Sequence, residues 1–333
     1  MIKIKLSIPG FGDCLNLAQF LGNKENIHES CKFYVNDPSI DSADFWFVMD
    51  DLQRKREICR VPRGNVFFLS GEVVYPKGYY DEPDKKIFLD QFAEIITCHD
   101  IFRDNSKVDL PFLPWMINAN HGPSILGETS RDVLWLAELK NLEKSKLISV
   151  FCSAKTITAD HSFRLKFVRK LKDHFGSHLD WFGNGVQSIS QKWDGIAPYK
   201  YHIVLENQAR YNIITEKLYD SYLGLAFPIY WGAPNVADFF SEQSYRAIEI
   251  MNWRNAIALI EDAINSTLWE NRFQSLVESK QLVVSKYNLF KRLANIAKTQ
   301  SRPNDFKDTV ELFNVQSAIM VELVSTLILE SRI

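Results

Sequence analysis

Residues 199–235, YKYHIVLENQARYNIITEKLYDSYLGLAFPIYWGAPN, decide the fold. The apolar run Tyr201–Leu205 predicts a strand, and this strand delivers Glu206-Asn207 at its carboxyl end. Thr215 is a natural N-cap, so a helix is predicted over Thr215–Leu225. A second strand, Pro228–Trp231, then runs into a glycine turn. Strands that alternate with helices in this way are typical of a parallel α/β sheet.

The start of that helix is predicted to bind an anion. Ligands of open α/β sheets bind beyond the carboxyl ends of the strands, and the free N–H groups of a helix N-terminus there attract negative charge. Lys217 adds a full positive charge in the first turn. The stretch therefore predicts a pocket that faces phosphate, a feature shared by many nucleotide-binding domains.

The same alternation extends in both directions and predicts two α/β domains. We expect the first over residues 1–140 and the second over 141–308, with the break inside 118–146, where the charged stretch Leu139–Lys146 looks helical. A helix is also expected over Asp160–His174. Strands are predicted at Ile2–Ser7, Asp44–Met49, Asn65–Leu69, Ile95–Cys98, Leu147–Cys152, Leu179–Phe182 and Ala247–Ile250.

The last part of the chain, residues 309–333, is predicted to form a C-terminal return helix. Val310 to Ile328 is dense in Leu, Ile and Val, which favours a helix packed across both domains. A helix lying on a membrane surface is the alternative, although its polar face lacks the usual Lys and Arg.

Composition excludes several classes of protein. The chain has 333 residues, 46% of them hydrophobic and 24% charged, as in an ordinary globular protein with two cores. A net charge of −2 provides no basic field for nucleic acid. The sequence shows no signal-peptide pattern and no apolar run long enough to span a bilayer. With five scattered cysteines, we expect reduced thiols and a cytoplasmic protein, with peripheral contact at the inner membrane face left open.

Three pieces in order, YKYHIVLEN, IITEK and PIYWGAPN, resemble the motif region of the α-1,3-fucosyltransferases of glycosyltransferase family 10. The resemblance is strongest over about 147–250 and weak in the N-terminal half. It implies a GT-B fold, in which two Rossmann-like domains face each other across a cleft. It also implies GDP-fucose as the donor substrate, a glycan as the acceptor and inverting transfer, with a role in surface polysaccharide synthesis.

The resemblance also suggests roles for individual residues. Lys217 and Arg164 match the family's cations at the donor diphosphate. Glu216 resembles its glutamate that binds donor hydroxyls, and Asn207 its motif asparagine. Glu72, at the end of the strand-like FFLSGE, resembles the proposed general base.

Two positions depart from the family pattern. Ile213 stands where an aromatic residue is common, and Tyr211 lies close enough in sequence to replace it. Gln208 stands where serine is common. Both changes keep open the alternative of another nucleotide-sugar donor. A GT-B domain that binds without turnover is a further alternative, against which the presence of Glu72, Arg164 and Lys217 argues. Gly183, in a tight Gly-Asn-Gly turn, is a further candidate for contact with the donor.

Transfer of a sugar from a nucleotide donor requires a carboxylate and fixed positive charges. A carboxylate base removes the proton of the acceptor hydroxyl, and fixed cations stabilise the charge of the leaving diphosphate, so no metal is required. Each residue also has a structural alternative. The cations could lie on a solvated helix face, Glu216 could serve the helix dipole, and Asn207 and Glu72 could belong to ordinary turns. Asp50-Asp51, which follows a predicted strand, is expected to cap a helix rather than to bind a metal.

Overall fold

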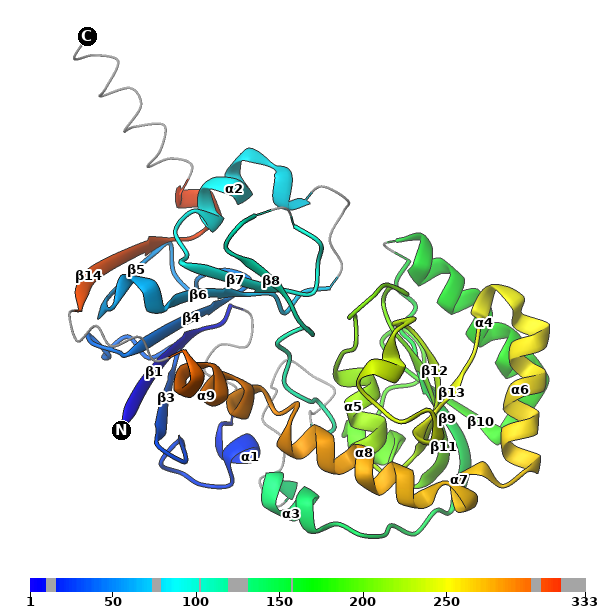
Figure 1. Ribbon diagram of the computed structural model, residues 1–333. Coiled ribbons are helices and arrows are strands. Elements are labelled where there is room, and N and C mark those ends of the chain that lie inside the picture. The colour runs from blue at the N-terminus through cyan, green and yellow to red at the C-terminus, as the bar shows by residue number, and fades with distance from the viewer. Residues whose placement is uncertain are drawn as a thin grey trace. The chain divides into compact units, whose positions relative to one another are not determined.

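The computed structural model describes residues 1–9, 16–73, 79–101, 103–118, 131–156, 158–300 and 307–318. The chain forms two compact units, each with its own sheet (Figure 1). The first unit comprises Met1–Leu17, Asn23–Phe112 and Arg292–Ile333, and the second comprises Ala18–Gly22 and Leu113–Lys291.

The second unit is built on a five-stranded parallel sheet. Its strand order is β10-β9-β11-β12-β13, so β11 lies at the centre. All five residues of β12 are buried, which is expected for a parallel strand covered on both faces. The strands are β9 (Lys146–Phe151), β10 (Leu179–Phe182), β11 (Tyr199–Leu205), β12 (Phe227–Trp231) and β13 (Arg246–Ala247).

Helices cover both faces of this sheet (Figure 1). One face carries α4 (Ala159–Phe175) and α6 (Trp253–Asn265), and the other carries α5 (Glu216–Leu223) and α8 (Phe273–Ser285). Helix α4 begins at Ala159 because Thr158 caps it, accepting the N–H of His161. The shorter helices of the unit are α1 (Ala18–Leu21), α3 (Val133–Glu138) and α7 (Leu268–Asn271).

The first unit contains a seven-stranded sheet in the order β2-β3-β1-β4-β6-β7-β8. Its pairs are parallel apart from the short β2–β3 pair. The strands are β1 (Ile2–Ser7), β2 (Ile27–His28), β3 (Cys31–Val35), β4 (Phe45–Met49), β6 (Val66–Leu69), β7 (Glu94–Thr97) and β8 (Ser106–Val108). A separate antiparallel pair joins β5 (Arg56–Val61) to β14 (Asp308–Phe313).

The core of the first unit lies between its sheet and α2 (Pro83–Leu89). Trp46 and Phe68 from the sheet pack there with Phe88 of α2 and with Leu312 of β14. Figure 1 shows α9 (Leu289–Thr299) on the opposite side of the sheet from α2. The fold therefore agrees with the predicted α/β class with parallel sheets.

Most predicted elements around the site are confirmed with small changes of boundary. Strands Ile2–Ser7 and Leu179–Phe182 have the predicted limits, and the helix after Thr215 begins at Glu216. The prediction for Ala247–Ile250 is wrong beyond its first residue, because β13 ends at Ala247 and a 3-10 turn begins at Ile250.

The helix predicted for Leu139–Lys146 is not present. Helix α3 ends at Glu138, and the carbonyl groups of its last turn accept hydrogen bonds from the buried ammonium of Lys280. The chain then continues without regular structure to β9. Lys144 donates from this extended segment to the carbonyl oxygens of Ala197 and Gly224, each at 2.7 Å. The charged residues therefore anchor a connection instead of forming a solvated helix.

The start of the predicted C-terminal helix is also wrong. Residues 308–313 form β14, in which Val310 and Leu312 are buried and alternate with more exposed side chains. An alternation with period two fits a strand rather than a helix. A helical turn begins only at Val315, and residues 319–333 lie outside the described part of the chain. The division into units also differs from the expected boundaries, because 113–140 belongs to the second unit and 292–308 to the first.

Candidate functional site

The candidate site in the second unit lies where β11 ends and α5 begins. Glu206, directly after β11, is fully buried, and its carboxylate accepts two hydrogen bonds from Thr215. The backbone N–H of Thr215 donates to Oε1 at 2.9 Å, and its hydroxyl donates to Oε2 at 2.6 Å. Thr215 in turn caps α5 by accepting the N–H of Lys217. The buried carboxylate therefore fixes the loop that carries the helix N-terminus.

Lys217 lies between two carboxylates. Its ammonium is 3.0 Å from Oε1 of Glu216 and 3.8 Å from Oε2 of Glu206. Burial works against the charge of Lys217, but the two carboxylates raise its pKa. Burial likewise opposes ionisation of Glu216, yet Lys217 lowers the pKa of that carboxyl to about 2. Both side chains are consequently ionised at neutral pH, and about a quarter of the Lys217 side chain remains exposed.

Arg164 reaches the same strand end from α4. It is only 5% exposed, so the alternative of a solvated helix face is wrong for this residue. Its Nη1 donates to the carbonyl oxygens of Leu205 and Glu206 and to Oδ1 of Asn207 at 2.8 Å. Its Nε is buried and has no hydrogen-bond partner in the described part of the chain. Arg164 thus orients Asn207, and its Nε–H makes no hydrogen bond to the described residues.

His161 lies near both Arg164 and Lys217. His161, one turn before Arg164 on α4, has a lowered pKa because it is buried and because both cations lie near it. Its Nδ1 is 2.5 Å from the hydroxyl of Thr158. The pKa of Glu206 shifts upward instead, because burial raises it and Lys217 only partly offsets this effect. The site therefore combines a neutral imidazole with two fixed cations.

Gly183 and Tyr211 lie on loops at the same carboxyl edge of the sheet. Gly183 has φ +152°, and a Cβ there would lie 2.5 Å from the carbonyl oxygen of Cys152. Glycine is therefore required where the ends of β9 and β10 approach each other. Tyr211 is 67% exposed, whereas Ile213 is buried. Of these two residues, Tyr211 has the ring that a ligand could contact.

Glu72 belongs to the first unit, in the loop after β6. It is exposed, and its backbone N–H donates to the carboxylate of Asp50 at 3.0 Å, as does the N–H of Gly71 at 2.8 Å. Burial raises the pKa of Asp50 to about 6. The expectation that Asp50-Asp51 caps a helix is wrong, because β5 follows and Asp51 instead accepts the N–H groups of Leu52 and Val315.

Two residues with clear structural roles were not among the candidates from the sequence. The sequence indicates only that Glu206 lies at a strand end, whereas in the structure it holds Thr215 and lies 3.8 Å from the ammonium of Lys217. The sequence predicts a helix cap at Asp50, which in the structure fixes the loop that carries Glu72. The available signal is the same in both cases: an acidic residue directly after an apolar run, Phe45–Met49 before Asp50 and Ile203–Leu205 before Glu206.

The described residues contain no group of three or more His, Cys, Asp or Glu side chains that could hold a metal ion. Within the same ranges, no helix combines the length and the apolar character needed to cross a bilayer.

Comparison with known proteins finds relatives of the region that contains this site. Residues 141–267 match the family model described as glycosyltransferase family 10 (fucosyltransferase), C-terminal. A stretch of 96 residues is 31% identical to an alpha-(1,3)-fucosyltransferase FucT of Helicobacter pylori, and it spans 27% of this chain and 20% of that protein. The resemblance to family 10 is thereby confirmed over the region that carries the Glu206–Lys217 arrangement.

Two solved structures show the fold. A crystal structure of an α1,3-fucosyltransferase with GDP aligns with a TM-score of 0.51 at 19% identity, covering 91% of each chain. Another structure, described as that of an α1,3-fucosyltransferase, aligns with a TM-score of 0.52 at 16% identity, covering 92% of this chain and 91% of that one. The protein has the GT-B fold, and its second unit resembles the C-terminal region of the family 10 glycosyltransferases.

Proposed function

We propose that the protein is an inverting glycosyltransferase that moves fucose from GDP-fucose to a hydroxyl group of a glycan, in the synthesis of a surface polysaccharide. The observation that carries the proposal is the capped start of α5, where Lys217 is ionised and partly exposed at the carboxyl edge of the sheet. This arrangement lies inside the region that matches the family model. One of the structural relatives was also crystallised with GDP.

In this proposal, Lys217 binds the diphosphate of the donor. As the glycosidic bond breaks, negative charge grows on the leaving GDP, and a fixed cation at a helix N-terminus stabilises that charge. Glu206 and Glu216 hold the ammonium in place, so little reorganisation is needed during the reaction. Arg164 adds positive charge and holds the end of β11. A phosphate oxygen would accept from its Nε, which is buried without a partner among the described residues.

The remaining candidates would contact other parts of the substrates. Glu216 and Asn207 would bind donor hydroxyls, and the exposed ring of Tyr211 would lie against the nucleoside or the sugar. Gly183 would allow the donor to approach the backbone closely. Glu72, with its carboxylate on an exposed turn, would act as the base that removes the acceptor proton.

A different nucleotide-sugar donor is the second candidate function. Ile213 is buried where the family commonly has an aromatic residue, and the side-chain oxygen Oε1 of Gln208 is buried without a partner among the described residues. An unpaired buried acceptor is costly unless a ligand supplies a donor group. The two departures therefore bear on donor identity rather than on the reaction type.

Donor hydrolysis over a panel of nucleotide sugars tests the proposal. Release of GDP from GDP-fucose is expected. Release from another donor alone would support the second candidate, and release from none would support a binding domain without turnover. Addition of glycan acceptors should then give a product with inverted anomeric configuration.

Lys217→Ala tests the residue that carries the proposal. It should slow GDP release by about 30- to 1000-fold, because one lost contact to developing charge typically costs roughly 2–4 kcal/mol. Lys200→Ala is the matched control, since Lys200 pairs with Glu270 on the surface of the same unit. A folded Lys217→Ala protein, checked by circular dichroism, that releases GDP as fast as the control would refute the diphosphate role.

A further inference from the structure

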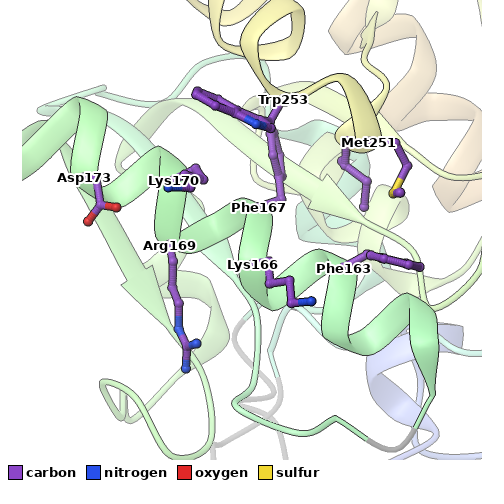
Figure 2. A pocket seen from close by; sticks show the side chains of 9 residues that line it. Phe163, Lys166, Phe167, Arg169, Lys170, Asp173, Met251 and Trp253 are labelled. Atoms are coloured by element: carbon purple, nitrogen blue, oxygen red, sulfur yellow. The ribbon is translucent and has the colours of Figure 1, made fainter.

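A second concave surface lies on the outer side of α4, and nothing in the proposed reaction uses it. The pocket has a volume of about 440 Å³ and lies between α4 and the 3-10 turn Ile250–Asn252 with the start of α6. Figure 2 shows Met251 and Trp253 across from Phe163 and Lys166. The floor is apolar, because Phe167 and Ile250 are both buried.

The rim exposes large apolar side chains to water. Met251 is 61% exposed and Phe163 is 36% exposed, and Trp253 stands partly exposed beside them. Single exposed apolar residues are common, but three large ones around one pocket form a patch that favours an apolar partner. A small soluble anion such as phosphate would leave this apolar surface uncovered.

The same rim carries positive charge. Lys166, Arg169 and Lys170 line the pocket on successive turns of α4, and all three are exposed. The ammonium of Lys170 lies 5.7 Å from the centre of the Trp253 ring, on which Arg254 also packs at 4.4 Å.

Two acidic residues belong to the same elements as these cations. Asp173 lines the pocket, and Glu249 on the turn accepts the N–H of Met251. Four cations against two carboxylates leave the surface positive.

We propose that this surface, defined by Phe163, Lys166, Arg169, Lys170, Met251 and Trp253, binds an anionic phospholipid bilayer. The combination of charges and exposed side chains carries the inference. Trp at the level of the headgroups, with an exposed Met and Phe reaching toward the acyl boundary, is typical of proteins that bind at a membrane interface. The cations complement anionic headgroups.

Vesicle flotation of the full chain tests the proposal. The protein should float with vesicles of phosphatidylglycerol and phosphatidylcholine at low salt, and it should float weakly with phosphatidylcholine alone. High salt should reduce binding, because the attraction between basic residues and anionic headgroups is screened. Failure to bind the phosphatidylglycerol vesicles, or equal binding to both kinds, would overturn the proposal.

The triple variant Lys166→Gln, Arg169→Gln, Lys170→Gln locates the surface. Each basic residue near an anionic surface contributes about fivefold to binding, so the partition coefficient should fall by roughly a hundredfold. All three side chains are exposed, and glutamine is compatible with a helix, so the fold should persist. Met251→Ser, which leaves the charge unchanged, should weaken binding severalfold.

A control variant removes the same formal charge elsewhere. Arg54→Gln, Lys55→Gln, Arg60→Gln changes three exposed cations of the first unit and should bind vesicles as the wild type does. Equal loss of binding in both triple variants would overturn the proposal, as would displacement from vesicles by soluble glycerol phosphate. Donor hydrolysis without vesicles should be the same in all these proteins, so failure here is distinguishable from failure of the proposed function.

Discussion

Replacement of Thr215 by valine should destabilise the second unit far more than replacement by serine. Thr215 is 1% exposed, and its hydroxyl performs two tasks. It donates to Oε2 of Glu206 at 2.6 Å, and it accepts the N–H of Lys217 as the N-cap of α5. Valine has the same shape as threonine but has neither a donor nor an acceptor, so both interactions are lost without a change of volume.

The expected size follows from these two losses. Removal of an N-cap typically costs about 1 kcal/mol, and a buried carboxylate oxygen left without its donor costs about 1–3 kcal/mol. We therefore expect Thr215→Val to lower the free energy of unfolding by about 2–4 kcal/mol. Thr215→Ser keeps the hydroxyl and loses one buried methyl group, which costs about 0.8 kcal/mol.

Urea unfolding of both variants at pH 7, followed by tryptophan fluorescence, measures the difference. If Thr215→Val unfolds within about 0.5 kcal/mol of Thr215→Ser, the hydroxyl does not hold the junction between β11 and α5, and the role assigned to Thr215 is incorrect. The difference should also shrink in a Glu206→Gln background, because the charged acceptor is then absent.

Three further predictions concern other parts of the two units. Gly183→Ala should cost about 2–4 kcal/mol in thermal unfolding, because its Cβ would lie 2.5 Å from a backbone oxygen, whereas Gly176→Ala, with φ +55° and open space around it, should cost about 1 kcal/mol. Glu216→Gln should cost about 2–3 kcal/mol at pH 7. Although burial opposes ionisation, the neighbouring lysine lowers the folded pKa of Glu216 to about 2, so the difference from wild type in urea should hold above pH 4.5 and fade as the pH approaches 2. Asp50→Ala should reduce the rate of transfer, because the loop that carries Glu72 loses its acceptor. Asp50→Asn keeps an acceptor and tolerates φ +61°, so it should retain most of the activity. Equal transfer rates in the two variants would contradict the role of Asp50 in holding this loop.

The sequence was sufficient to predict the elements around β11 because local signals agreed there. The apolar run before Glu206 and the N-cap at Thr215 fall where the structure has β11 and the start of α5. In other parts of the chain, contacts between distant residues decide the structure against the local sequence pattern. The charged stretch before β9 looks helical, but Lys144 is held by two carbonyl groups more than fifty residues away in the chain. Pairing of β14 with β5 joins segments about 250 residues apart, and no local pattern encodes that choice.

The contacts of Arg164 and Glu206 were also beyond local patterns, since both are set by tertiary packing. An arginine on a helix can equally lie on a solvated face, yet Arg164 is buried against the end of β11. Its position follows from the packing of α4 on the sheet. The sequence therefore indicated which residues were candidates, but not that Arg164 holds the backbone of the strand end as well as Asn207.

Both units hold a candidate reactive residue by the same physical arrangement. In each, an acidic residue directly follows an apolar strand and becomes largely buried: Asp50 after β4 and Glu206 after β11. A carboxylate is an acceptor with two oxygens, so it can fix two donors of a neighbouring loop at once. Asp50 accepts the N–H groups of the turn at Glu72, and Glu206 accepts the N–H and hydroxyl of Thr215. Burial opposes ionisation and raises the pKa of both acids, and the hydrogen bonds that each carboxylate accepts partly offset this rise. An acidic residue after an apolar strand should therefore be considered as a support for the adjacent loop before it is assigned to a metal or to a helix cap.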